Sequence, residues 1–524
     1  MLTASPVPRP MSRRQFLASS LGLAAAAPGL LAQARADRPQ KGGLLRLGIS
    51  GGFTSDSLDP ARISDAFMTL LSFGQLRNTL VEIDEQGRPR PELADGWDVS
   101  PDARVWRFGL RRGVEFHHGK TLEAADVLAS INHHRGRQSV SPVKVLLDNI
   151  LHLRPDGKAG VVFELRDGQA DFPFVLADIH LTIQPHDGDV TTGVGTGGYQ
   201  LVEFEPGVRS LTRRNPNYWR AGRAHFEAVE MLAIADVNAR TAALQTGRVD
   251  VINRCELKTL HLLSRLPGIQ VLQTHGTKHY SLPMHTDVAP FDNPDVRLAL
   301  KYAIDRDALL RTILRGYGSL GNDHPISRGQ PSFAARLAQR HYDPDRARFH
   351  LRRAGLDSLR LRLSTSDAAF PGAVDTAVLY REHAARAGIA LQTVREPADG
   401  YWKNVWLTKP FCLCSWNGQP TPGLMFATAY AEDAVWNDTH FRHPRFNQLL
   451  RAARAELDEP KRAEQYAEMQ TIVRDEGGVI IPLFAADVCA ADSRLRFGQL
   501  ASHRELDGGR CAERWWWARE PGGS

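Results

Sequence analysis

Hydrophobic and polar positions repeat along the chain with two different periods, one typical of strands and one typical of helices. Residues 43–49 read GLLRLGI, in which every second position is apolar, so we expect a first strand there. Residues 66–80 and 372–387 carry apolar side chains on one face at helical spacing and predict two helices. Residues 356–367 and 389–396 return to strand character, so strands are expected on either side of the second helix.

Turn residues between these segments predict how strands and helices follow one another. Residues 197–215 form two strand-like runs around Pro206-Gly207, which is the pattern of a hairpin. Residues 236–252 predict a helix that Gly247 closes with a left-handed backbone, followed directly by a strand. Units of this kind are what an α/β layer needs, so we assign the chain to the α/β fold class.

Helix ends are predicted from capping residues. Thr121 is the expected N-cap of a helix that continues to residue 134. Asn293 and Asp305 are the expected N-caps of two consecutive helices, and Gly316 is expected to end the second of them.

The first 36 residues have the pattern of an export signal. Arg13 and Arg14 precede an apolar run over residues 16–31, and residues 34–36 have the small-x-small pattern that signal peptidase cleaves. The arginine pair also matches the twin-arginine export motif. We therefore expect residues 1–36 to be a twin-arginine signal peptide that is cleaved after Ala36, and the mature chain to be soluble in the bacterial periplasm.

Charge and length narrow the class of protein further. The 524 residues include 65 Lys and Arg and 59 Asp and Glu, with a net charge of +6. The expected signal peptide contains four arginines and no acid, so the mature chain has only 61 basic residues against 59 acidic ones. No basic run with interleaved aromatic residues occurs, and nucleic acid is therefore not an expected partner. The remaining 488 residues exceed one ordinary core and predict two or three lobes.

Cysteine usage allows a disulfide but does not define one. The periplasm is oxidising, and an odd number of cysteines leaves at least one free thiol or an intermolecular bond. Cys412-Leu413-Cys414 matches no common zinc spacing, so we expect alternate side chains on a buried strand and no metal site. The five cysteines are Cys255, Cys412, Cys414, Cys489 and Cys511.

Enzyme motifs are present only as fragments. Residues 48–52 match the G-x-S-x-G nucleophile elbow around Ser50, but a loop with Pro60 follows where that motif needs a helix. A secreted serine hydrolase using Ser50 is therefore an alternative that we do not favour. Residues 193–198 match G-x-G-x-x-G, yet a strand follows them instead of the helix that binds a dinucleotide. No cofactor and no enzymatic activity are predicted.

Six ordered strings between residues 57 and 310 resemble a known family. They look like the peptide/nickel class of ABC-transporter substrate-binding proteins, family 5, which includes dipeptide-binding proteins. No one string is specific, but six in the right order are. The strings are "SLDPA" (57–61), "PELADGWDVSPDARVWRFGLRRGVEFHHGKTLEAADV" (91–127), "GVGTGGYQLVEFEPG" (193–207), "RRNPNYW" (213–219), "AALQTGRVDVI" (242–252) and "VRLALKYAIDRDALL" (296–310).

The resemblance implies a two-lobed Venus-flytrap fold, in which a hinge closes the lobes on a ligand. It places the first lobe at 37–285, with an extra subdomain at about 80–190. The second lobe is expected at 286–485, and residues 486–524 are expected to return to the first lobe.

The resemblance also implies a function. The protein would capture a peptide-like or other small polar solute in the periplasm and deliver it to the permease and ATPase subunits of an inner-membrane ABC importer. A monomer is expected. A nickel or metal-chelate binder of the same family is an alternative. Gly198 stands where the family usually has proline.

A second departure from the family pattern concerns the ligand's ammonium group. Dipeptide binders of this family have an aspartate after a W-x-G segment, whereas residues 419–424 here contain no acid. A buried ammonium without a partner is unfavourable by several kcal/mol. Ordinary dipeptides are therefore not expected, unless Asp287 or Asp438 replaces the missing partner.

Four segments are candidates for contact with the ligand, because the family binds its ligand between loops of both lobes. Several of them contain tryptophan, whose indole combines apolar area with one N–H donor. Trp515, Trp516 and Trp517 are expected to pack or to staple the lobes instead. The candidates are Ser64, Asp65 and Phe67; Tyr280, His285 and Asp287; Trp402 and Trp406; and Trp416, Asn417, Trp436, Asn437 and Asp438.

Overall fold

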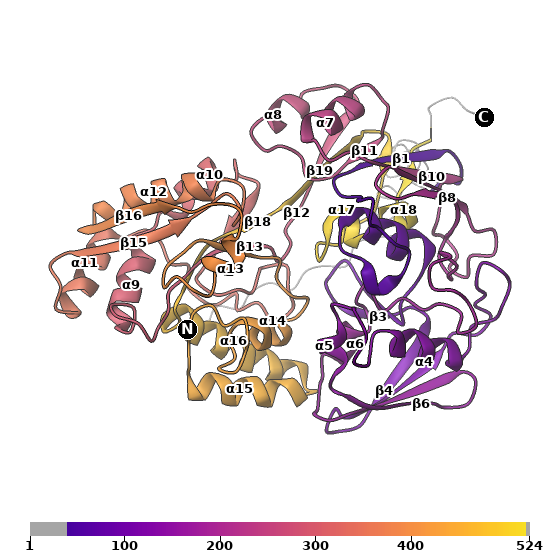
Figure 1. The fold of residues 1–524 in the computed structure, drawn as a ribbon, viewed down its shortest axis with the longest axis horizontal. Helices are drawn as coiled ribbons and strands as arrows, with labels where there is room; N and C mark the ends of the chain where they lie inside the picture. The colour runs from indigo at the N-terminus through magenta and orange to yellow at the C-terminus, as the bar shows by residue number, and fades with distance from the viewer. Residues whose placement is uncertain (1–38, 520–524) are drawn as a thin grey trace, which may run out of the picture.

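The computed structural model describes residues 39–519, so the signal peptide, the twin-arginine motif and cleavage after Ala36 lie outside the described residues. The ribbon forms two α/β lobes (Figure 1). Among residues 39–519, no helix has the length and apolar character to cross a lipid bilayer.

A seven-stranded sheet forms the centre of the first lobe. β1 runs parallel to both of its neighbours, and its alternating Leu45, Leu47 and Ile49 are fully buried in the core. The expected hairpin is β8–β9, and α7 (Val237–Gln245) ends just before Gly247, whose φ is 70°. The strands in order across the sheet are β12 (Ile269–Thr274), β19 (Asp487–Asp492), β11 (Val251–Ile252), β1 (Leu44–Ile49), β10 (Ala228–Ala233), β9 (Arg209–Arg214) and β8 (Tyr199–Glu205).

A four-stranded antiparallel sheet with its own apolar core is attached to this lobe. The core contains side chains from Leu80 to Ile183, including a cluster of rings around Phe108 and Phe172. This segment also contains short helices, so with its own sheet and its own core it has the architecture of a small subdomain. Its elements are β4 (Ala94–Val99), β5 (Val105–Leu110), β7 (Gly160–Leu165) and β6 (Ile150–Pro155), with α4 (Ala124–His133), α5 (Lys144–Leu147) and α6 (Phe172–Val175).

The second lobe contains a four-stranded sheet and a parallel strand pair. The strands of the pair, β15 and β16, flank α12, as the sequence pattern predicts. The sheet comprises β14 (Gly318–Leu320), β18 (Val479–Ala485), β13 (His279–Pro283) and β17 (Cys414–Trp416); the pair is β15 (Leu359–Thr365) with β16 (Ile389–Arg395). The helices are α9 (Pro294–Tyr302), α10 (Arg306–Thr312), α11 (Pro344–Arg353), α12 (Ala373–Ala385), α13 (Tyr401–Asn404), α14 (Pro422–Ala429), α15 (Pro444–Ala455) and α16 (Glu459–Asp475).

The chain passes between the two sheets at two neighbouring places. β12 belongs to the first sheet and β13 to the second, while β18 belongs to the second and β19 to the first. The first crossing therefore lies before residue 279, earlier than the predicted boundary at 285. The reason is that residues 279–283 are all buried, and Leu282 joins the core of the second lobe.

Two predicted helix boundaries are wrong. The helix expected over 66–80 consists of α3 (Ala66–Met68) and a π-helix (Thr69–Leu76), after which Arg77 is extended and its buried guanidinium donates to Leu58 O and Ser72 Oγ. Thr121 is not the N-cap of α4, because it forms a β-bridge with Glu115. Glu123 is the N-cap instead, and its backbone N–H donates to the Asp126 carboxylate.

The subdomain contacts the second lobe directly. The Ala170 N–H donates to the carbonyl of Arg454 at 2.6 Å, and the Tyr466 hydroxyl donates to Asp171 at 3.4 Å. Leu457, between α15 and α16, packs against the apolar core of the subdomain. The two lobes therefore meet at a second place besides the strand crossings.

The C-terminal segment ends in the first lobe (Figure 1). Trp515 is fully buried in the core of that lobe, beside Phe497, and Trp517 lies in a short strand pair, β20 (Leu495–Arg496) with β21 (Trp516–Trp517). These indoles pack within the first lobe, so the alternative of an interlobe staple is wrong for Trp515. The segment also contains α17 (Glu505–Gly508) and α18 (Cys511–Arg514).

Candidate functional site

Four tryptophans from three segments of the second lobe form a continuous ladder. The ring centroids of Trp402 and Trp406 are 5.7 Å apart, those of Trp406 and Trp416 are 5.7 Å apart, and those of Trp416 and Trp436 are 6.3 Å apart. The first two pairs are nearly perpendicular, the edge-to-face arrangement that indoles favour. The two ends of the ladder are open, since Trp402 is 44% and Trp436 is 49% exposed.

Asp438 lies beneath the middle of the ladder. Its Oδ2 accepts the indole N–H of Trp406 at 3.0 Å and that of Trp416 at 3.3 Å. The side chain is only 2% exposed, and burial raises the pKa of this carboxyl to about 6. Asp438 therefore sets the orientation of two indoles, and its hydrogen-bonding oxygen is already used.

Local hydrogen bonds place these residues. Trp416 is on β17, directly opposite His279 of β13, so the sheet fixes its position. The Asn437 amide donates to the carbonyls of Ala431 and Phe441 and thereby closes the loop that holds Asp438. Asn437, predicted as a ligand contact, is thus fully engaged within its loop.

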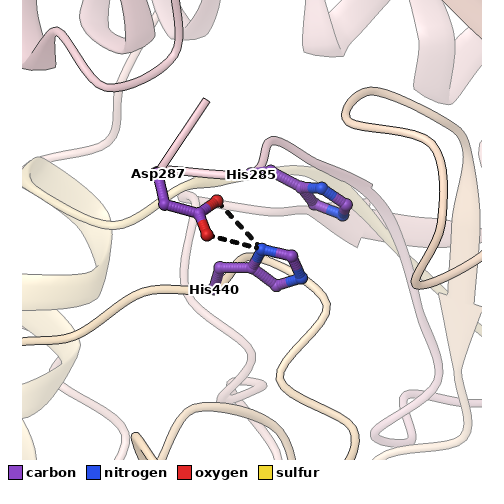
Figure 2. Close-up of side chains that lie close together, drawn as sticks. All are labelled: His285, Asp287 and His440. Carbon is purple, nitrogen blue, oxygen red and sulfur yellow. Dashed lines mark hydrogen bonds and ion pairs between the residues drawn. The ribbon is translucent and has the colours of Figure 1, made fainter. Parts of the chain in front are cut away.

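A second group of polar side chains lies beside this loop. The imidazoles of His285 and His440 are stacked, with centroids 3.9 Å apart, and the Asp287 carboxylate is 2.9 Å from Nδ1 of His440 (Figure 2). Burial, and then the neighbouring His440, lower the pKa of His285 to about 4. The His285 ring is therefore neutral at physiological pH.

The other predicted ligand contacts are not part of either group. Phe67 is fully buried and packs in the core of the first lobe, so its role as a ligand contact stays a prediction. Tyr280 is buried in the core of the second lobe, where its ring stacks on that of Phe370 with the centroids 3.8 Å apart. Asp65 caps α3 by accepting the Met68 N–H, and Ser64 is exposed beside it.

Asn417 is exposed next to Trp416, and its carbonyl accepts the Thr277 hydroxyl. As a ligand contact it stays a prediction. Sequence reasoning missed His440, which is 153 residues from Asp287 and stands in no recognisable motif.

The segment around Ser50 lacks the geometry of a nucleophile elbow. β1 is followed by a loop and the 3₁₀ turn Pro60–Arg62, not by a helix that would support a strained serine. The Ser50 N–H is engaged with the Asn253 side chain at 2.8 Å.

The described cysteines also form no paired site. All five are free thiols, and Cys412 and Cys414 are buried in the second lobe.

Comparisons with known proteins agree with this architecture. A model of the bacterial extracellular solute-binding proteins, family 5 Middle, matches residues 88–438. The chain is 26% identical to the peptide transport periplasmic protein SapA of Salmonella typhimurium over 461 residues, covering 80% of this chain and 83% of that protein. It is 26% identical to heme-binding protein A of Haemophilus influenzae over 462 residues, with the same coverage.

Solved structures give the same fold. The structure of HbpA2 from Haemophilus parasuis matches with a TM-score of 0.81 at 20% identity, covering 89% of this chain and 99% of that one. At this identity the match supports the two-lobed fold.

Proposed function

Because the chain belongs to the bacterial extracellular solute-binding proteins of family 5, we propose that the tryptophan ladder is the surface on which it captures its solute. The protein is the solute-binding component of an ABC importer. It works with a permease and an ATPase, and its relatives are periplasmic. The observation that carries the proposal is the open ladder with Asp438 fixed beneath it.

The exposed ends of the ladder support a ligand contact. Trp436 is half exposed, and Val435 beside it is almost fully exposed, although both are large apolar side chains. Contiguous apolar surface of this kind on a soluble protein marks a place where another molecule binds. Edge-to-face indoles present both ring faces and ring edges, so they suit a solute with planar or apolar groups.

The charges of the site argue for a solute without a free ammonium group here. Residues 419–424 contain no acid, and the buried carboxylate of Asp438 already accepts two indole N–H groups. Asp287, the other substitute considered, is paired with His440. We therefore propose a peptide-like solute whose amine is blocked, or a small polar solute with an aromatic or apolar part.

We further propose that the mature protein begins after Ala36 and captures the solute as a monomer, without turnover. The Ser50 segment lacks the support a nucleophile needs, which favours stoichiometric binding over hydrolysis. Loss of any ester or amide turnover in a Ser50→Ala variant would argue against this part of the proposal.

A thermal-shift screen of the chain from residue 37 tests the site and the solute class together. The panel contains free dipeptides, N-acetylated peptides, opines, amino-acid conjugates and nickel chelates. A micromolar ligand at millimolar concentration stabilises the folded state by about 4 kcal/mol, which is readily measured. We expect N-acetylated peptides or conjugates with an aromatic group to give the largest shift.

Trp436→Ala is the matching variant, with Phe349→Ala as its control, because Phe349 on α11 is exposed to a similar degree. We expect Trp436→Ala to weaken solute binding at least tenfold and Phe349→Ala to leave it unchanged. Equal solute affinities of the two variants would show that the ladder is not the binding surface, but they would not affect the family assignment. The largest shift with free dipeptides would overturn the argument from the missing acid.

A further inference from the structure

We propose that His285, Asp287 and His440 form a binding site for one divalent ion of a first-row transition metal, with zinc or nickel as the metals to test. This inference goes beyond solute capture, since none of the four ladder tryptophans is required for it. The three residues come from two segments, the end of the β13 strand and the loop after Trp436 (Figure 2).

The donor atoms already lie close together. One nitrogen of each imidazole and one carboxylate oxygen are all within 4.8 Å of one another, and this is the one such group of three found within residues 39–519. Nδ1 of His440 lies 2.9 and 3.1 Å from the two Asp287 oxygens.

The backbone holds both segments in register without a metal. The Thr286 N–H donates to the Thr439 carbonyl at 2.8 Å, and the His285 N–H donates to the Pro410 carbonyl at 3.0 Å. The first bond joins the two segments next to His285 and His440, and the second ties His285 to the segment before β17. His440 also has a φ of 52°, a left-handed conformation that is uncommon outside glycine.

The donor set selects the class of metal. Two imidazoles and one carboxylate are typical ligands of zinc, nickel, copper and iron, whereas magnesium and calcium prefer oxygen ligands alone. Three protein ligands leave at least one coordination position open. The site is reachable from solvent, because the His440 side chain is 37% and the Asp287 side chain 60% exposed.

The surroundings add one further titratable pair. His443 follows on the same segment, and its Nε2 lies 3.3 Å from the Glu476 carboxylate. That contact is made with α16, so His443 is engaged elsewhere. The carboxylate of Asp287 favours a cation over an anion at this site.

Calorimetric titration of the chain from residue 37, first stripped with EDTA, tests the proposal. Zinc chloride and nickel sulfate are titrated separately into the parent protein and three variants: His285→Ala, Asp287→Asn and His440→Ala. We expect one ion per chain, and a loss of affinity above about tenfold in each variant, since even outer-shell partners of metal ligands contribute that much. Because the Asp287 side chain is exposed, we expect the Asp287→Asn variant to fold normally. This variant therefore tests the site even if the histidine variants misfold.

Two controls separate this site from other sources of metal binding. His261→Ala removes an exposed histidine on α8 (Leu260–Leu263) of the first lobe and is expected to bind the metal as the parent does. Trp436→Ala is likewise expected to bind the metal normally. The metal titration therefore tests the metal site independently of the proposal that the ladder binds the solute. The electron paramagnetic resonance spectrum of the Cu²⁺-loaded parent should show coupling to two imidazole nitrogens.

Absence of saturable binding of either metal overturns the proposal. So does a loss smaller than tenfold in all three variants, or a Cu²⁺ spectrum without imidazole coupling.

Discussion

Arg510 is the residue on which the C-terminal segment depends. Its guanidinium is buried and pairs with Glu92 of the subdomain at 2.8 Å and with Glu513 at 2.8 Å. It also lies 4.2 Å above the ring of Phe73. Coulombic attraction to Glu92 and Glu513 outweighs burial and raises the pKa of Arg510 well above its ordinary range. One side chain thus joins three parts of the first lobe that are distant in sequence.

Arg510→Met should destabilise the protein strongly. The substitution keeps the apolar stem but leaves Glu92 buried without its cation and Glu513 dependent on Arg220 at 3.4 Å. Breaking a buried pair in this way costs about 3–5 kcal/mol. The free energy of unfolding from urea titration measures the loss. The exposed Arg360 on β15 provides the control, and Arg360→Met is expected to change stability by less than about 0.5 kcal/mol. Similar values for the two variants would contradict this role for Arg510.

At the scale of elements, helix–helix contact in the first lobe depends on a glycine. A Cβ on Gly74, in the π-helix Thr69–Leu76, would lie 2.2 Å from the carbonyl oxygen of Gly509. The π-helix and the turn between α17 and α18 therefore approach each other more closely than any other residue at position 74 allows.

Gly74→Ala should separate these elements and lower stability by about 1–3 kcal/mol, the usual range for overpacking a core. Gly498→Ala is the control, because a Cβ there meets no atom within 4 Å. Thermal unfolding of both variants distinguishes them. Equal melting temperatures of Gly74→Ala and Gly498→Ala would show that the backbone can move to accommodate the added methyl group without loss of stability.

Elements were largely predictable from sequence, whereas contacts between them were not. The caps Asn293 and Asp305 are where the pattern places them, since an N-cap depends on a few neighbouring residues. Thr121 fails as a cap because it pairs with Glu115, and such pairing leaves no local signal.

The same limit applies to the candidate site. The tryptophans were identifiable as residues, but the pairing of Asp438 with two indoles was not. The burial of Phe67 in the first-lobe core was not predictable either, because an aromatic residue next to a loop has the same local sequence pattern in a core and in a ligand site.

At the scale of the whole molecule, the two crossings and the contact between the subdomain and the second lobe both connect the lobes. Asp171 of the subdomain is buried at that contact, where Tyr466 donates to it. Burial raises the pKa of Asp171, and Arg462 and Arg454 oppose this effect only in part. Separation of the lobes would return the carboxyl to water and to its ordinary pKa of 3.8.

The contact between the lobes should therefore strengthen as pH falls. The form with the contact has the higher pKa and binds more protons, so protonation favours it below neutral pH. Asp171→Asn mimics the protonated state and should hold the lobes together at pH 7 with little pH dependence.

Energy transfer between dyes on the two lobes, measured across pH, checks this prediction. Asp167→Asn, at an exposed position of the same subdomain, is the control and should behave as the parent protein does. A parent protein whose lobe separation is independent of pH would contradict the argument.

The position of β19 also determines the order in which the molecule can be completed. β19 lies between β11 and β12 of the first sheet, but it is synthesised after the entire second lobe. Until residues 487–492 leave the ribosome, β11 and β12 have unpaired edges facing one gap, and such edges promote aggregation. The second lobe, continuous from residue 279 to 485, can fold first. The seven-stranded sheet of the first lobe is therefore the last part to be completed, and a nascent chain that stops before β19 leaves this sheet open.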